Sequence, residues 1–251
     1  MWLAPVLDRV TRYVGVDGCS GGWFAVAYDP DGGVDFDRYP SFAAVVDAYP
    51  DAERVLVDMP IGLPTTGRRA CDVDARERLG SRASTVFFAP PRAVLDAPDH
   101  ETASELNRDR TGHGLSIQAW HLVPRVREVD AALRADADVR DRVVEAHPEL
   151  CFAALGDGPV PESKTTEPGR RERLDRLRSV LPDADTVYEA CLDAHYRKHV
   201  ARDDVVDAMV LAASAPQPLD RVPDVPDGSV PRDDVGHPME IRFPVDRASG
   251  R

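Results

Sequence analysis

Five acidic residues stand where a folded chain can gather them into a metal site. Three short apolar runs end on an acid, and a late apolar segment begins with two more: the five are Asp17, Asp58, Glu145, Asp204 and Asp207. In a helix, positions 204 and 207 are i and i+3 and share one face. Carboxylates held this close repel one another, and divalent cations that prefer oxygen ligands, such as Mg²⁺ or Mn²⁺, relieve the repulsion. We therefore expect all five as catalytic residues, and all but Glu145 as metal ligands.

Two such cations about 4 Å apart can activate a water molecule and stabilise the leaving oxygen of a phosphodiester. The set thus predicts a two-ion nuclease centre, although each acid alone has a simpler explanation. An acid at a strand end is commonly a turn residue, and Asp204 can be a favourable charge at a helix start. Asp17, followed by glycines, also fits a turn that approaches phosphate without a metal. The joint occurrence of the acids favours the metal cluster.

Nearby histidine and arginine residues are weaker candidates. His147 follows Glu145 by two residues and is a candidate proton shuttle, although a structural histidine fits the position equally well. The stretch 68–82 is rich in arginine and suits phosphate binding, and ion pairs with acids on the same helix explain it as well. The candidate phosphate-binding residues are Arg69, Arg76 and Arg82.

Short apolar runs between turn signals predict the strands that carry the acids. The runs 13–17, 23–28 and 34–39 indicate three successive strands, because glycine-rich turns separate them. Ser41 caps a helix over 42–49, and a fourth strand follows at 55–57.

The second half of the chain is mostly helical in pattern. Residues 68–138 form irregular helices, and a fifth strand follows at 143–145. Further helices are expected at 170–180, 190–200 and 203–215, with a late apolar piece at 239–241.

This order of elements is that of an RNase H-like α/β fold, in which helices flank a mixed five-stranded sheet and a helical insertion separates strands 4 and 5. We expect one such domain over residues 13–244 with the insertion at about 66–140. A leader at 1–12 and a tail at 245–251 are expected to be loose.

Composition indicates the environment of the protein rather than its reaction. The formal net charge is −13, and only Lys164 and Lys198 among the 31 basic residues are lysines. An acidic, lysine-poor surface is typical of a halophilic cytoplasm. No segment resembles a signal peptide or a membrane span, so a cytoplasmic protein is expected. The four cysteines are too far apart for a zinc site or a disulfide framework and are expected to be buried.

An ordered set of motifs resembles an uncharacterised bacterial and archaeal family of predicted nucleases with an RNase H fold. The likeness covers about residues 13–244 and rests on the segments 14–23, 57–63, 69–80, 84–90, 114–118, 128–130, 145–149, 204–208 and 236–241. The segment 204–208 is also similar to the end of the RuvC-type junction resolvases, where two acids one turn apart complete the metal site. The resemblance implies a metal-dependent nuclease. The chain departs from the family at Ile117 and Arg125, where the family tends to lysine.

Three functions stay open on the sequence. The first is a Mg²⁺- or Mn²⁺-dependent hydrolase that cuts DNA or RNA, including branched forms. The second is a phosphotransferase or ATPase of the actin and sugar-kinase type, although no second phosphate loop or adenosine motif is present. The third is a module that binds nucleic acid without cutting it. The sequence leaves the oligomeric state open.

Overall fold

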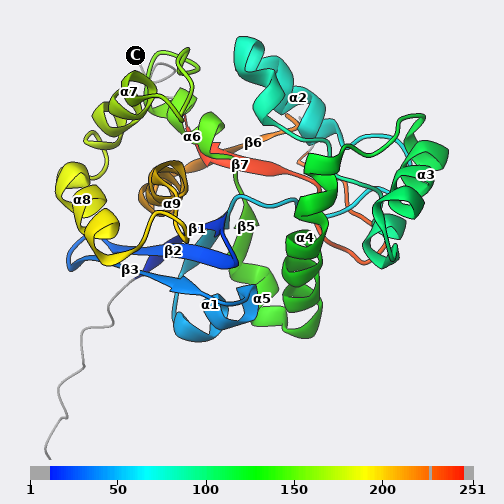
Figure 1. Cartoon of the computed structure of the whole chain (residues 1–251), viewed down its shortest axis with the longest axis horizontal. Coiled ribbons are helices and arrows are strands. Elements are labelled where there is room, and N and C mark those ends of the chain that lie inside the picture. Colours follow the sequence, from blue (N-terminus) through cyan, green and yellow to red (C-terminus); the bar gives the residue numbers. More distant parts are fainter. Residues whose placement is uncertain (1–11, 226–227, 246–251) are drawn as a thin grey trace, which may run out of the picture.

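The computed structural model of the chain describes residues 12–225 and 228–245 (Figure 1). A five-stranded mixed sheet has the strand order β3-β2-β1-β4-β5. Its strands are β1 (Tyr13–Cys19), β2 (Gly22–Asp29), β3 (Gly33–Tyr39), β4 (Arg54–Val57) and β5 (Val143–Glu145). The first three strands form an antiparallel meander, and β4 and β5 run parallel to β1. The expected mixed α/β sheet and its five strands are confirmed.

Helices cover both faces of this sheet (Figure 1). Between β4 and β5 lie α2 (Ala70–Leu79), the 3-10 helices η1 (Gly80–Thr85) and η2 (Arg92–Asp96), α3 (His100–Thr111), α4 (Ile117–Ala135) and α5 (Ala137–Arg142). The remaining helices are α1 (Phe42–Ala48), α6 (Pro148–Leu155), α7 (Glu167–Leu177), α8 (Ala184–Ala194) and α9 (Arg202–Ser214). Among the described residues, no helix combines the length and apolarity needed to cross a membrane.

Alternation along the strands divides the core into two layers. Val14 and Val16 of β1 face the layer that contains Phe42 of α1 and Val126 of α4. Phe24 and Val26 of β2 face the other layer, which is built around α6, α7, α8 and α9, whereas Ala25 between them faces the first layer. A period of two along each strand produces this division, because successive side chains point to opposite faces.

Gly15 brings the last helix into backbone contact with the central strand. A Cβ atom at this position would lie 2.1 Å from the Ala208 carbonyl oxygen and 2.2 Å from the Ala212 nitrogen. Only a residue without a side chain allows α9 to pack this closely on β1. The contact lies one residue from Asp207 and two from Asp17, so it fixes how near those two acids approach.

A second, two-stranded sheet closes the C-terminal end of the described chain. Here β6 (Leu219–Val222) pairs antiparallel with β7 (Ile241–Pro244). A parallel bridge between Ala146 and Arg242 continues β7 beside the end of β5. The edge of the main sheet at β5 is therefore partly covered, whereas β3 forms the opposite edge with β2 as its partner.

Some element boundaries differ from the expectation. A helix over 190–200 is wrong, because α8 ends at Ala194 and buries Ala184, Tyr188 and Cys191 at helical spacing. Helix α7 begins at Glu167 rather than at residue 170. Thr166 caps its start, because the Thr166 side chain accepts a hydrogen bond from the Gly169 nitrogen. The expected leader and tail lie outside the described residues except for residues 12 and 245.

Candidate metal centre

Three carboxylates from three separate elements meet at the carboxyl end of the parallel strands. Asp17 belongs to β1, Asp58 follows β4 directly, and Asp207 projects from the first half of α9. One oxygen from each lies within 4.8 Å of the others. Backbone pairing fixes two of these residues, since the Asp58 nitrogen donates to the Val16 oxygen at 3.0 Å. The structure thus brings together three of the five acids expected from the sequence.

Burial makes the negative charge of this cluster costly. Asp17 is 8 % exposed and Asp207 is 1 % exposed. Burial, followed by the charges of Asp58 and Asp207, raises the pKa of Asp17 well above its usual range. Burial raises the pKa of Asp207 to about 7 although Lys164 opposes the shift, and burial also raises the pKa of Asp58. These directions indicate a site that needs positive charge.

The donor atoms fit a divalent metal ion. All three groups offer carboxylate oxygens, which suit Mg²⁺ and Mn²⁺. The Oδ1 atom of Asp207 is buried and has no hydrogen-bond partner among the described residues. A buried oxygen in that state costs free energy unless a ligand satisfies it. Asp17, Asp58 and Asp207 are therefore the residues that could hold a cation.

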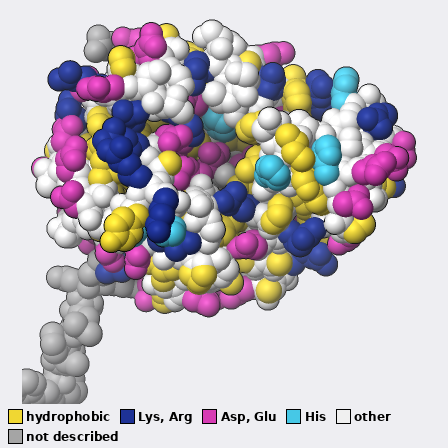
Figure 2. Space-filling model, viewed as in Figure 1, with side chains coloured by type: hydrophobic (Ala, Val, Ile, Leu, Met, Phe, Trp, Pro, Cys, Tyr) yellow, Lys and Arg dark blue, Asp and Glu magenta, His cyan; other side chains and the backbone are white. Residues whose placement is uncertain are grey.

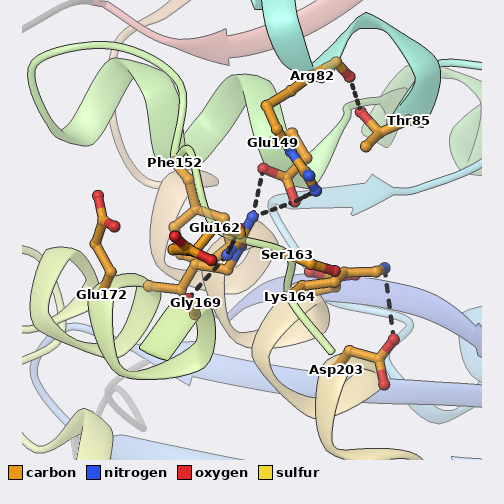
Figure 3. Close-up of polar contacts among 12 residues, drawn as sticks. Arg82, Thr85, Glu149, Phe152, Glu162, Ser163, Lys164, Gly169, Glu172 and Asp203 are labelled. Carbon is orange, nitrogen blue, oxygen red and sulfur yellow. Dashed lines mark hydrogen bonds and ion pairs between the residues drawn. The ribbon is translucent and has the colours of Figure 1, made fainter. Parts of the chain in front are cut away.

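Lys164 is a member of the site that the sequence pattern did not predict. Its Nζ atom donates to Asp207 Oδ2. The same atom lies 3.9 Å from Asp203 Oδ2 (Figure 3). Burial opposes its charge, but Asp207 and Asp17 outweigh that effect and raise the pKa of the amine. The residue lies in the polar loop before α7, where nothing in the local sequence marks a site. Its rarity was the available signal, since arginine replaces lysine almost everywhere else.

Glu145 lies apart from the cluster in a buried ion-pair network. Arg69 donates to both of its carboxylate oxygens at 2.7 Å and also pairs with Asp72. The Ile61 nitrogen donates to Glu145 at 2.6 Å. Burial raises the pKa of Glu145 to about 7, although Arg69 opposes the shift. These partners occupy Glu145, so the geometry gives no support to its catalytic role.

The same network changes the interpretation of Arg69. Its side chain is 1 % exposed, and its guanidinium also donates to the Ile61 carbonyl at 2.9 Å. Two carboxylates and a carbonyl therefore take up the hydrogen-bond donors of this guanidinium. Because local pairing with Asp72 and long-range pairing with Glu145 engage these donors, the geometry gives no support to the phosphate-binding role expected for Arg69.

Asp204 shares a helix face with Asp207 as expected but turns toward its own helix start. Its Oδ2 atom accepts a hydrogen bond from the Ala201 nitrogen at 2.9 Å. Burial raises the pKa of Asp204, and its charge adds to the rise at Asp17. It is not one of the three acids whose oxygens converge, so it contributes charge close to the centre rather than a converging oxygen.

His147 lines the wall of the centre, whereas Arg76 and Arg82 lie outside its lining. His147 Nε2 lies 3.3 Å from the Thr85 carbonyl, and its buried Nδ1 has no partner within the described chain. Arg82 Nη2 lies 3.9 Å from a Glu149 oxygen. Arg76 donates to the Val86 carbonyl at 2.6 Å, and its guanidinium also lies over the Phe88 ring. The proton-shuttle and phosphate roles of these side chains stay predictions.

The centre opens into a cleft of about 290 Å³. The three acids and Lys164 line it together with Arg125 and His147. Figure 2 shows acidic side chains in a hollow of the surface with basic side chains around it. Phe87, which is 46 % exposed, also lines a neighbouring cavity of about 410 Å³. An acidic floor with cationic walls suits an anionic substrate that approaches through bound metal.

The two departures from the resembling family lie in different settings. Arg125 lines the cleft, and its guanidinium donates to the Cys19 carbonyl. Ile117 is 46 % exposed at the start of α4 and is not part of the cleft lining.

Comparison with known proteins gives a family but no activity. Neither curated proteins nor solved structures include a match to this chain. One family model matches residues 15–228, which include all five strands of the main sheet apart from the first two residues of β1, together with Asp17, Asp58, Lys164 and Asp207. The chain therefore belongs to the family described as "Protein of unknown function (DUF429)".

Proposed function

We propose that the protein is a divalent-metal-dependent nuclease with an RNase H-like fold, which hydrolyses phosphodiester bonds of DNA or RNA. The observation that carries this proposal is the convergence of Asp17, Asp58 and Asp207, whose ligand oxygens lie within 4.8 Å of one another. The buried, unpartnered Oδ1 atom of Asp207 supports it independently.

The arrangement of elements supports the fold assignment. An antiparallel meander, two further parallel strands in the order β3-β2-β1-β4-β5 and a closing helix on the central strand are the features expected for that fold. In it, acids at the ends of β1 and β4 and on the closing helix share one site. Asp17, Asp58 and Asp207 occupy these positions.

Each side chain of the cleft has a distinct task in the proposed reaction. The three aspartates hold the cation, and Arg125 supplies positive charge to the wall that receives the substrate phosphates. Arg76 and Arg82 lie outside the cleft lining and are candidates for contacts to a longer substrate. His147, with one ring nitrogen near the Thr85 carbonyl, is placed to exchange a proton with the leaving oxygen. When bound, the metal supplies an activated water and stabilises charge that develops on the phosphate.

The alternative functions have less support. A phosphotransferase of the actin and sugar-kinase type needs two related domains, and residues 12–225 and 228–245 contain a single five-stranded sheet. A binding module without catalysis would keep the metal and lose turnover. The acidic floor of the cleft favours metal-assisted chemistry over simple phosphate binding, because bare carboxylates repel the phosphate backbone.

A cleavage screen tests the proposal. Purified protein is incubated with single-stranded, duplex, hybrid and branched substrates and Mn²⁺ in molar KCl, since the composition is the kind expected for a high-salt cytoplasm. The Asp17→Asn protein runs beside it, and Asp47→Asn serves as the matched control because Asp47 is an exposed carboxylate on α1. We expect cleavage by the wild type and the control and none by Asp17→Asn.

Two results would contradict the proposal in different ways. Cleavage that survives Asp17→Asn would come from another site or from a contaminant. Metal-dependent binding of a substrate without turnover under every condition would identify a binding module instead.

A further inference from the structure

The position of Lys164 bears on how many metal ions the centre holds. Its amine donates to Asp207 Oδ2, and the second oxygen of Asp207 is the buried atom without a partner. One carboxylate therefore divides its two oxygens between a lysine and an open position. A centre with two ions about 4 Å apart usually needs a carboxylate whose two oxygens bridge both ions, or several additional acids.

The loop that carries Lys164 is anchored rather than free. Arg173 is fully buried, and its guanidinium donates to the Glu162 carbonyl at 3.0 Å and to Glu149 at 2.7 and 2.8 Å. Gly169 allows the loop to press against α7, because a Cβ there would lie 2.1 Å from the Ser163 oxygen. Figure 3 shows Glu149, Glu162 and Gly169 around the loop. In the same view Lys164 is directed toward Asp203. The anchored loop fixes the backbone of Lys164, and Asp207 binds its amine. The positive charge therefore stays in place without metal.

Lysine suits this place better than arginine. Its ammonium is a compact point charge with three donors, whereas a guanidinium is a wide planar fork. The chain has 31 basic residues and only two lysines, so a lysine here departs from the general use of arginine in the sequence. With a side chain 34 % exposed, Lys164 can contact Asp207 and still face the cleft.

We propose that Lys164 Nζ takes the second cation position of the centre, so that Asp17, Asp58 and Asp207 bind one divalent ion instead of two. This inference rests on the metal centre proposed above. The three ligands carry three negative charges, which one divalent ion and one ammonium balance. Their oxygens lie within 4.8 Å of one another, so small side-chain movements bring them to the separations of about 3.0–4.2 Å that bonds of about 2.1 Å to one octahedral ion require.

The ammonium then acts as a positioning group for the substrate. Its remaining donors face the cleft, where they can hold a phosphate oxygen next to the bound ion. A fixed single charge cannot leave the site when the product departs, which separates this centre from one assembled entirely from exchangeable ions.

Counting bound Mn²⁺ by isothermal titration calorimetry tests the inference on the full chain. We expect one ion per chain for the wild type and two for Lys164→Gln, because the substitution frees Asp207 Oδ2 and restores negative charge. The first ion should also bind at least about tenfold more tightly to Lys164→Gln, since the repelling charge has gone. Lys164→Arg keeps the charge and should still bind one ion. Lys198→Gln is the matched control, because the other lysine of the chain is exposed beside Tyr196.

Two wild-type ions, or one ion in folded Lys164→Gln, would overturn the inference. If Lys164→Gln does not fold, the counts for the wild type and Lys164→Arg decide it. The proposed nuclease function can be wrong while this inference is right. If Lys164→Gln raises the number of bound Mn²⁺ ions from one to two but no protein cleaves nucleic acid, the single-ion centre is supported and the nuclease function is not. No Mn²⁺ binding by any variant would remove both.

Discussion

The substitution Gly15→Ala tests whether close packing of α9 on β1 sets the geometry of the metal centre. The added Cβ would lie 2.1 Å from the Ala208 oxygen, while ordinary van der Waals contact begins at 3.4 Å. The helix must therefore retreat by about 1.3 Å, the difference between these two distances. The obstacle is backbone on both sides, so no change of side-chain rotamer relieves it.

Two measurable losses follow from that displacement. Overpacking costs about 1–3 kcal/mol, and more where backbone must move. We therefore expect the free energy of unfolding, measured by urea denaturation, to fall by at least about 3 kcal/mol. Asp207 moves with α9, and a misplacement of about 1 Å can cost about 100-fold at a site that requires exact geometry. We therefore expect Mn²⁺ affinity, measured by calorimetry, to fall at least about 100-fold.

Gly33→Ala is the matched control. Gly33 begins β3, and a Cβ there meets nothing within 4 Å, although its φ of +113° imposes backbone strain. This variant should lose some stability and keep its metal affinity. A folded Gly15→Ala protein with wild-type Mn²⁺ affinity would refute the claim that this contact positions Asp207.

Three further predictions concern other parts of the molecule. Arg69→Met leaves Glu145 and Asp72 buried without their cation and should lower the free energy of unfolding by about 3–5 kcal/mol in urea, whereas an unchanged midpoint would show that the network is dispensable. Burial lowers the pKa of His237, so on acidification the unfolded chain takes up this proton before the folded chain does, and stability falls as the pH drops below about 6.5. The His237→Gln protein should therefore lose less stability than the wild type between pH 7 and 5 in urea denaturation. Equal losses would contradict this. Phe87→Ala should weaken binding of single-stranded nucleic acid by about 1–3 kcal/mol in fluorescence anisotropy without changing stability, because the ring is exposed on the cleft wall.

Local sequence signals predicted the five strands of the main sheet because the apolar runs are bounded by turns, whereas β6 (Leu219–Val222) was not predicted. The run from Tyr13 extends as β1 to Cys19, two residues past Asp17, since Gly18 and Cys19 pair with Trp23 and Gly22. Ser41 caps α1 as expected and accepts a hydrogen bond from the Ala44 nitrogen. These signals are local, so they can be found without knowledge of the fold.

Helix α6, which is buried on all sides, gave no such signal. Every residue of α6 (Pro148–Leu155) is buried, so its sequence has no polar face from which a period of 3.6 could be detected. Helix α8 does have such a face, but the acids and alanines on both sides of it blur where it begins and ends.

The centre was predictable to the extent that local context determined it. Asp17, Asp58 and Asp207 follow from strand ends and a helix start. Glu145 has the same local context and lies elsewhere, because Arg69, 76 residues away, pairs with it. Lys164 has no such local signal, and contacts made in the folded chain, such as the anchoring of its loop by Arg173, direct it to the acids. The sequence pattern could not predict which charged residues pair over long distances along the chain.

The edge strand β3 has a consequence for self-association in concentrated salt. Its exposed residues Asp35 and Asp37 alternate with the half-buried Val34 and Phe36, so a second copy that added a strand there would bring carboxylates together. At about 1 M salt the Debye length is only about 3 Å, shorter than the spacing of about 4.8 Å between paired strands. Repulsion across such an interface would then be largely screened. What still opposes the growth of the sheet from molecule to molecule is the water that these carboxylates would have to give up.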